Sequence, residues 1–110
     1  MAEPLVSTES LTIEELKKIR LERVTLDGVV CNSPCLLYSV IIASDGVGEG
    51  DADLYDGTSI QDERKLDLYT VDEMMYELIF NTPVYMRKGI YIDIGTNCES
   101  VVVQYMPLRW

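Results

Sequence analysis

Two segments near the C-terminal end of the chain alternate between apolar and other side chains, and this period of two constrains the fold most strongly. Residues 90–94 carry isoleucine at every second position, and residues 101–105 carry Val, Val and Tyr in the same way. Successive side chains leave a β-strand on opposite sides, so each segment predicts a half-buried strand. Gly95 and Asn97 lie between the segments, and both residue types tolerate a positive φ. We therefore predict a closing hairpin with a loop of about four or five residues.

The same alternation recurs along most of the chain. Residues 24–30, 51–56 and 65–70 each place apolar side chains on one face. Residues 35–43 are apolar on both faces apart from one serine, which predicts a central strand covered on both sides. Turn residues separate these segments, as at 32–34. About eight strands at such spacings predict an all-β protein, an antiparallel β-sandwich or jelly roll.

The segment before the predicted hairpin allows two interpretations. Met, Glu and Leu are good helix formers and favour a helix over residues 71–79. The alternation of residues 74–80, together with Tyr76 and Phe80, favours a strand that ends at residues 81–83. We predict the strand.

A helical signal stands at the N-terminal end. Thr12 is a suitable N-cap, and Glu15 completes a capping box. Apolar residues then follow a helical spacing, which predicts one short helix over residues 13–20. About two turns do not hold alone in water, so this helix docks either on its own sheet or on a neighbouring subunit. We divide the chain into an N-terminal arm with the helix (1–21), a β-sandwich domain (22–106) and a C-terminal tail (107–110).

The charge balance argues against several kinds of partner. The chain carries 19 acidic and 9 basic residues, a net charge of −10, with no histidine. Nucleic acids and anionic membranes both attract clustered Lys and Arg, so we predict neither as a partner. No segment resembles a signal peptide or a membrane helix. The odd number of cysteines, three, fits a protein made in a reducing compartment, with thiols that pack as small apolar side chains.

No catalytic arrangement emerges from the residues. Without histidine, a Ser or Cys nucleophile lacks its usual base, whereas composition leaves a glycosidase-type carboxylate pair open. The acidic stretch 45–56 fails the EF-hand pattern, because loop position five counted from Asp51 is Tyr55 and loop position three counted from Asp45 is Val47. A calcium site of another geometry stays open. We predict no enzymatic activity, no cofactor and no metal.

Apolar and aromatic side chains outside the predicted core are candidates for protein contact. Tyrosines on the second face of a sheet favour contact with another surface, since Tyr is enriched at interfaces; the alternative is that they cover the second sheet or pack under loops. The arm and the tail carry more apolar surface than a coil and a short helix hide alone. The ten candidates are Leu5, Val6, Leu11, Ile13, Leu16, Tyr55, Tyr69, Tyr91, Leu108 and Trp110.

Four short motifs carry a resemblance to a known group of proteins. They are LYDGTS at 54–59, PVY at 83–85, KGIYIDI at 88–94 and SVVVQY at 100–105. Over about residues 35–105 the chain resembles the small β-sandwich structural proteins of tailed bacteriophages, the capsid-decorating (cement) and connector-associated accessory proteins. The charged connection around residues 62–65 and the helical arm depart from that pattern.

The resemblance implies a structural virion protein, assembled in the host cytoplasm, that binds and stabilises the capsid or neck. Its partners would be the major capsid protein or a portal or neck protein, and we expect a homo-oligomer. The alternative is a carbohydrate- or calcium-binding β-sandwich module for host attachment.

Overall fold

The computed structural model describes residues 12–108 of the chain, which form one helical turn and eight strands. The helical turn is α1 (Ile13–Leu16). The strands are β1 (Arg20–Val24), β2 (Gly28–Cys31), β3 (Cys35–Ser44), β4 (Gly50–Asp56), β5 (Glu63–Thr70), β6 (Met75–Met86), β7 (Ile90–Ile94) and β8 (Cys98–Pro107).

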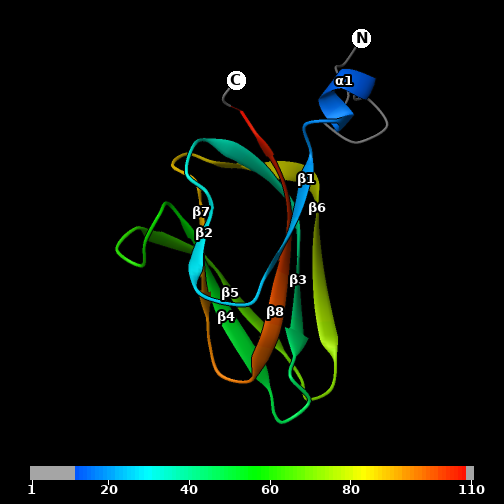
Figure 1. Ribbon diagram of the computed structural model, residues 1–110, viewed down its shortest axis with the longest axis vertical. Helices are drawn as coiled ribbons and strands as arrows, with labels where there is room; N and C mark the ends of the chain where they lie inside the picture. Colours follow the sequence, from blue (N-terminus) through cyan, green and yellow to red (C-terminus); the bar gives the residue numbers. More distant parts are fainter. Residues whose placement is uncertain (1–11, 109–110) are drawn as a thin grey trace.

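The strands form two four-stranded antiparallel sheets that stack face to face (Figure 1). Sheet A has the order β1-β8-β3-β6, and sheet B has the order β2-β7-β4-β5. The first four strands pair with the last four in reverse order: β1 with β8, β2 with β7, β3 with β6 and β4 with β5. The prediction of an all-β antiparallel sandwich is confirmed.

The core lies between the two sheets and consists of the apolar residues at alternate positions along the strands. Ile90 and Ile92 of β7 are fully buried, as are Val101 and Val103 of β8. The inner faces of β3 and β4 add Leu37, Val40, Ile42 and Leu54. Burying an aliphatic side chain of this size contributes about 1.5–3 kcal/mol, so these alternating positions are the main source of stability.

The predicted closing hairpin is wrong, although both of its strands exist. β7 pairs with β2 and β4 in sheet B, whereas β8 pairs with β1 and β3 in sheet A. The chain therefore crosses from one sheet to the other between residues 94 and 98. Both apolar faces still point into the same core, because the two strands cover it from opposite sides.

The strand predicted over residues 24–30 is also divided between the sheets. β1 ends at Val24 and β2 begins at Gly28, with a turn between them. The Asp27 carboxylate accepts the backbone N–H of Ile94 at 2.7 Å, which fixes this turn against the end of β7. Alternation alone did not reveal the turn, because both parts keep a similar pattern of faces.

The helix predicted over residues 13–20 is formed only in its first turn. Beyond α1 the chain leaves the helical conformation, and Arg20 begins a strand paired with residues 101–105. Pairing with β8 thus overrides a local helical preference that is weak in so short a segment. The side chain of Glu15, and with it the predicted capping box, lies outside the described residues. The strands span Arg20 to Pro107, so they begin inside the predicted arm and end on the first residue of the predicted tail.

β6 confirms the strand interpretation of residues 75–80 against the helical one. Residues 71–74 form a turn instead, with Glu73 at a positive φ of 62°. β6 does not end at residues 81–83 as predicted; it continues through Pro83 to Met86. Proline is tolerated there because β6 is an edge strand of sheet A and need not donate a hydrogen bond on its open side.

Candidate interaction surfaces

The apolar contact candidates at the two chain ends are only partly within the described residues. Leu5, Val6, Leu11 and Trp110 lie outside them. Ile13 and Leu16 are exposed on α1, which lies beyond the end of sheet A (Figure 1). Leu108 is half-buried, and its backbone N–H donates to the carbonyl oxygen of Pro34 at 2.9 Å. This bond anchors the chain just after β8 to the turn between β2 and β3.

The three predicted tyrosines all lie on sheet B. Tyr55 and Tyr91 are cross-strand neighbours whose rings meet edge to face, with centroids 6.2 Å apart and planes at 70°. Val29 of β2 pairs with Tyr91 and extends this apolar strip to the edge of the sheet. Tyr69 is 50% exposed, and a hydrogen bond to the Glu49 carboxylate raises the pKa of its hydroxyl. The outer face of sheet B therefore carries the aromatic surface that the sequence predicted.

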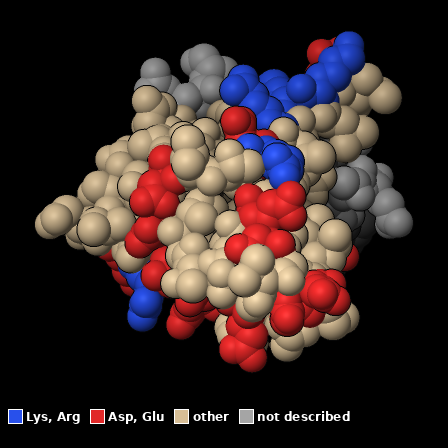
Figure 2. Space-filling view, turned by 60° about the horizontal axis from the view of Figure 1, so that its bottom comes forward, with Lys and Arg blue, Asp and Glu red and all other residues tan. Residues whose placement is uncertain are grey.

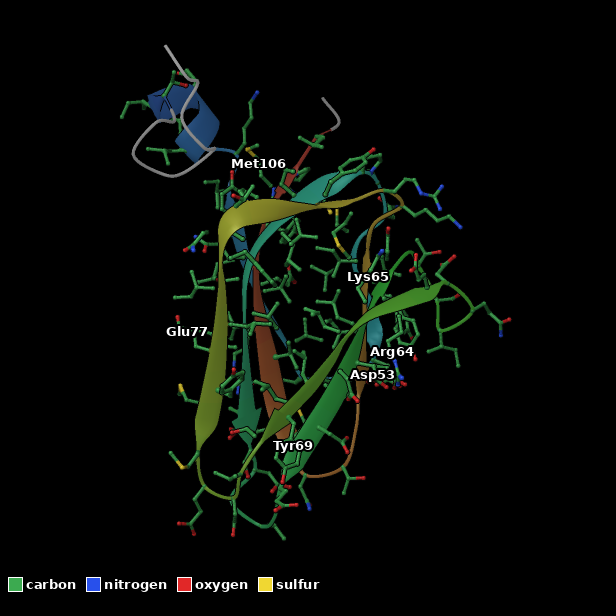
Figure 3. All side chains as sticks on the ribbon, turned by 180° about the vertical axis from the view of Figure 1, so that it is seen from behind. Asp53, Arg64, Lys65, Tyr69, Glu77 and Met106 are labelled. Atoms are coloured by element: carbon green, nitrogen blue, oxygen red, sulfur yellow. The ribbon has the colours of Figure 1, made fainter. Side chains whose placement is uncertain are left out.

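Aspartates cross the same face beside the tyrosines. Asp53 lies between Asp67 of β5 and Asp93 of β7 in register, and Asp27 contacts Asp93. Partial burial and the Asp67 carboxylate raise the pKa of Asp53, while the Arg64 guanidinium opposes the shift at 3.5 Å (Figure 3). Partial burial and Asp27 raise the pKa of Asp93 as well. The row is therefore a set of mutually repelling carboxylates with one cation beside it.

Two of the acidic residues in the stretch 45–56, Asp45 and Asp51, stabilise turns in the structure. Asp45 accepts the N–H of Val47 at 2.8 Å, and Asp51 accepts that of Thr96 at 2.9 Å. Within residues 12–108, no three carboxylate or thiol side chains are grouped so that they could hold a metal ion.

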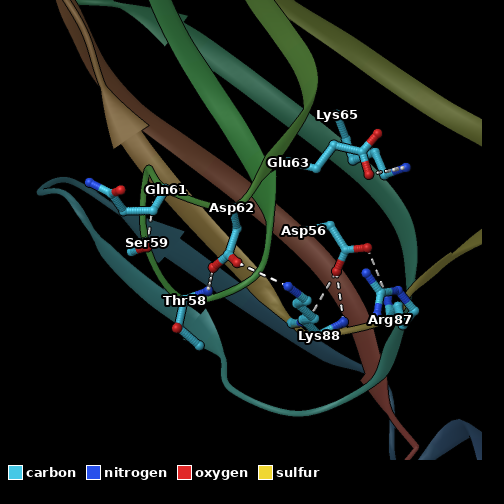
Figure 4. Close-up of polar contacts among 10 residues, drawn as sticks. Asp56, Thr58, Ser59, Gln61, Asp62, Glu63, Lys65, Arg87 and Lys88 are labelled. Atoms are coloured by element: carbon cyan, nitrogen blue, oxygen red, sulfur yellow. Dashed lines mark hydrogen bonds and ion pairs between the residues drawn. The ribbon is translucent and has the colours of Figure 1, made fainter.

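Asp56 is 6% exposed and binds the turn between β6 and β7 (Figure 4). Its Oδ1 accepts the N–H of Lys88 at 2.7 Å and that of Gly89 at 3.4 Å, and its Oδ2 accepts that of Arg87 at 3.1 Å. Gly89 has a φ of 145°, and a Cβ there would collide with the carbonyl oxygen of Cys31. This part of the LYDGTS motif thus has a structural role.

Asp62 holds the loop that follows Asp56. It accepts the N–H of Thr58 at 2.9 Å and pairs with the ammonium of Lys88 at 3.3 Å (Figure 4). The hydrogen bond from Thr58 and the charge of Lys88 lower the pKa of Asp62.

The three thiols are free, and two of them are buried. Burial raises the pKa of Cys35 and of Cys98. Because the thiolate is the nucleophilic and metal-binding form, these environments favour packing over reactivity.

The outer face of sheet A is a surface that the contact candidates did not include. It consists of one outward set of side chains from each strand, namely Leu21 and Arg23 of β1, Val102 and Gln104 of β8, Ser39 and Ile41 of β3, and Met75, Glu77 and Ile79 of β6. Leu21 is 72% exposed, and Met75 and Ile79 are each 65% exposed. The signal in the sequence was the strand at 35–43, which is apolar on both faces. Within residues 12–108, a second sheet covers only the inner face.

A pocket of about 600 Å³ opens at one end of this face, next to Ala43 and Met75. Asp45, Glu73 and Glu99 line its rim. Figure 2 views this end of the molecule and shows acidic side chains spread widely over it. The pocket is open and acidic, unlike the enclosed apolar cavities that usually hold small ligands.

No helix within residues 12–108 has the length and apolar character needed to cross a membrane. Comparison of the chain with protein-family models, with curated proteins and with solved structures found no match.

Proposed function

We propose that this protein is a structural component of a tailed-bacteriophage virion, where it binds and stabilises the capsid or neck as a decoration or cement protein. The observation that carries this proposal is the outer face of sheet A, where Leu21, Met75 and Ile79 are exposed beside the half-buried Ile41 and Val102. Exposed apolar patches on a folded domain mark interaction sites, including contacts with other proteins.

The strand order supports the same proposal. Eight strands wound so that the first four pair with the last four in reverse order are consistent with a jelly roll, and we assign the sandwich to that type. Jelly rolls serve as viral capsid domains and as lectins, so the architecture suits both the virion role and its alternative. Because one fold hosts many functions, the exposed face carries more weight than the fold.

The partners that we propose are the major capsid protein or a portal or neck protein. Two of the motifs that resemble phage accessory proteins contact each other in the sandwich, because Asp56 of LYDGTS binds the turn at the start of KGIYIDI. Free thiols suit assembly in the reducing cytoplasm of the host.

The test is the composition of purified particles. Particles from cells that express the gene are banded by density, and the protein is quantified by mass spectrometry against the major capsid protein. We expect a fixed stoichiometric ratio and immunogold labels on the head or neck. A protein abundant in the lysate but absent from the banded particles would contradict the proposal.

A carbohydrate-binding role in host attachment is the second candidate. The observation in its favour is the Tyr55–Tyr91 pair beside Asp53 and Arg64, because aromatic rings next to polar groups suit sugar faces and hydroxyls. Tyr91→Ala should abolish binding to host-surface polysaccharide in a glycan-binding assay if this role is correct. The same variant should leave the amount of protein in particles unchanged if the virion role is correct.

A further inference from the structure

We propose that the outer face of sheet A binds a second copy of this chain, in a two-fold dimer whose sheets stack face to face. The same face supports the proposed virion role, and this inference names a second copy of the chain as its partner, which leaves contacts with the capsid or neck to the arm and the tail. Dimerisation is measured on the purified chain without particles, so failure of the dimer and failure of the virion role can be distinguished.

The central strand β3 is incompletely buried. Its inner side chains, such as Val40 and Ile42, are fully buried, while the outward Ile41 is only half-buried. A strand that is apolar on both faces is typical of a sheet covered on both sides. The chain supplies one cover, sheet B, and leaves the other face open over residues 12–108.

Opposite charges lie on the two edge strands of this face. The molecule carries a net charge of −10, yet the cross-strand row at the middle of this face reads Arg23, Val102, Ile41, Glu77. The row thus has one cation on the edge strand β1, one anion on the edge strand β6, and two apolar residues between them. Arg23 also pairs at 3.5 Å with Glu99, where both side chains are more than half exposed, so this contact is weak. Figure 3 shows Glu77 pointing away from the sandwich, on the side opposite Asp53 and Arg64.

Within this row, the order of the charges favours one symmetry for the dimer. A two-fold axis that runs along the strands, between β8 and β3, reverses the cross-strand order in the second copy. It brings Arg23 opposite Glu77 of the partner subunit twice, and Ile41 opposite Val102 of the partner subunit twice. An axis across the strands would instead place Arg23 against Arg23 and Glu77 against Glu77, which is unfavourable.

The area of the outer face of sheet A suits a dimer interface. β3 and β8 are about 33 Å long, β6 is somewhat longer and β1 is about half as long, so four strands about 4.8 Å apart present a face of roughly 600 Å² in projection. Corrugation by side chains brings this close to the ~800 Å² per partner that a standard-size interface buries. Stacked sheets also pack at about 10 Å with interdigitating side chains, a distance that Leu21, Met75 and Ile79 can fill.

Sedimentation equilibrium of the full chain over a concentration series tests the proposal. We expect a dimer for the unaltered protein. Arg23→Glu alone and Glu77→Arg alone should each raise the dimer dissociation constant at least about 100-fold, because each reversal creates two like-charge contacts per dimer. The double variant Arg23→Glu/Glu77→Arg should restore dimerisation, and an equimolar mixture of the two single variants should form a heterodimer.

The matched control is Lys65→Glu, a charge reversal at an exposed site of sheet B, which should leave the dissociation constant unchanged. A thermal melt of each variant shows whether the sandwich is intact. Three outcomes would overturn the proposal: a monomer at every concentration, a dimer weakened equally by Lys65→Glu, or single variants that neither weaken the dimer nor form the heterodimer. The last result would assign association to another surface, such as the open edge of β6.

Discussion

Asp56 shows how a single side chain can join parts of the chain that lie far apart in sequence. It ends β4, and it accepts backbone N–H groups from the turn at residues 87–89. Buried carboxylates are costly unless their oxygens are hydrogen-bonded, and charge-assisted bonds to backbone N–H groups are among the stronger ones. From the sequence, Asp56 was predicted only to lie in a turn and to be one of several acidic residues. Its contact with the turn at residues 87–89 was not predicted.

Replacing Asp56 should therefore destabilise the fold strongly. We expect Asp56→Ala to lower the free energy of unfolding by about 2–4 kcal/mol, because several buried N–H groups lose their acceptor. Denaturant titration measures the change. Asp45→Ala is the matched control: it removes one exposed local hydrogen bond and should cost less than about 1 kcal/mol. Equal losses in the two variants would show that Asp56 has no special role.

Removing a charge from the aspartate row on sheet B should have the opposite effect and stabilise the fold. The pKa of Asp53 is raised, so the native state binds a proton more readily than the unfolded chain. The free energy of unfolding therefore falls as the pH rises from the pKa of Asp53 in the unfolded chain through its raised pKa in the folded protein. This destabilisation is complete at neutral pH. Asp67→Asn removes the charge directly across the strands and should increase stability by about 0.2–1 kcal/mol at pH 7.

The pH dependence separates this effect from a general loss of charge. At about pH 3, Asp53 is largely protonated because its pKa is raised, so its repulsion with the neighbouring carboxyl is lost, and Asp67→Asn and the unaltered protein should have nearly equal free energies of unfolding. Asp72→Asn removes the same charge from the exposed turn before β6 and serves as the control. A gain for Asp72→Asn as large as that for Asp67→Asn would assign the effect to net charge.

At the scale of elements, the sequence predicted strands well and their partners poorly. Alternation identified the core faces of β5, β7 and β8, because a period of two follows from strand geometry alone. It could not show that β7 and β8 lie in different sheets, since pairing depends on tertiary contacts that the pattern does not encode. The outer face of sheet A was missed for a related reason. Residues 35–43 predicted cover on both sides, and only the fold shows which side residues 12–108 leave open.

Removal of the N-terminal segment tests an element that stands apart from the sandwich. α1 lies beyond sheet A, so deletion of residues 1–17 should leave the melting temperature within about 3 °C of the full chain. We expect the same deletion to abolish co-sedimentation with capsid or neck particles, because the arm offers Ile13, Leu16 and further apolar residues to a partner.

Deletion of residues 108–110 is the companion experiment at the other end. It removes Leu108 and Trp110, together with the hydrogen bond from Leu108 to Pro34. We expect weaker particle binding and a small loss of stability, of about 1 kcal/mol. If both truncated proteins sediment with particles as the full chain does, neither end contributes to attachment.

At the scale of the whole molecule, electrostatic repulsion is the dominant feature of the surface. Asp45, Glu49, Asp72 and Glu73 are all exposed in the loops at one end, which Figure 2 shows coming forward. A molecule with a net charge of −10 is stabilised by any salt that screens this repulsion. A response to calcium must therefore be compared with a response to ionic strength.

We expect calcium to have no specific effect on stability. The carboxylates of Asp45, Asp51 and Asp56 already accept backbone N–H groups in separate turns. The melting temperature in calcium chloride should equal that in sodium chloride of the same ionic strength, and a chelator should change neither. An additional increase of several degrees in calcium alone would reveal an ion-binding site, since a ligand that binds only the folded state stabilises it.

The place of β8 in sheet A has a consequence for biosynthesis. β8 lies between β1 and β3, yet it is the last of the eight strands to be translated. Val24 of β1 pairs with Val101 of β8, and at about 5–20 residues per second a ribosome needs roughly 4–15 s to make the chain between them. Throughout that time β1 and β3 lack the strand that joins them, and the apolar β3 is open to premature pairing. Sheet A can close only after translation of β8, so the nascent chain depends on slow, non-local pairing and on protection from other chains until then.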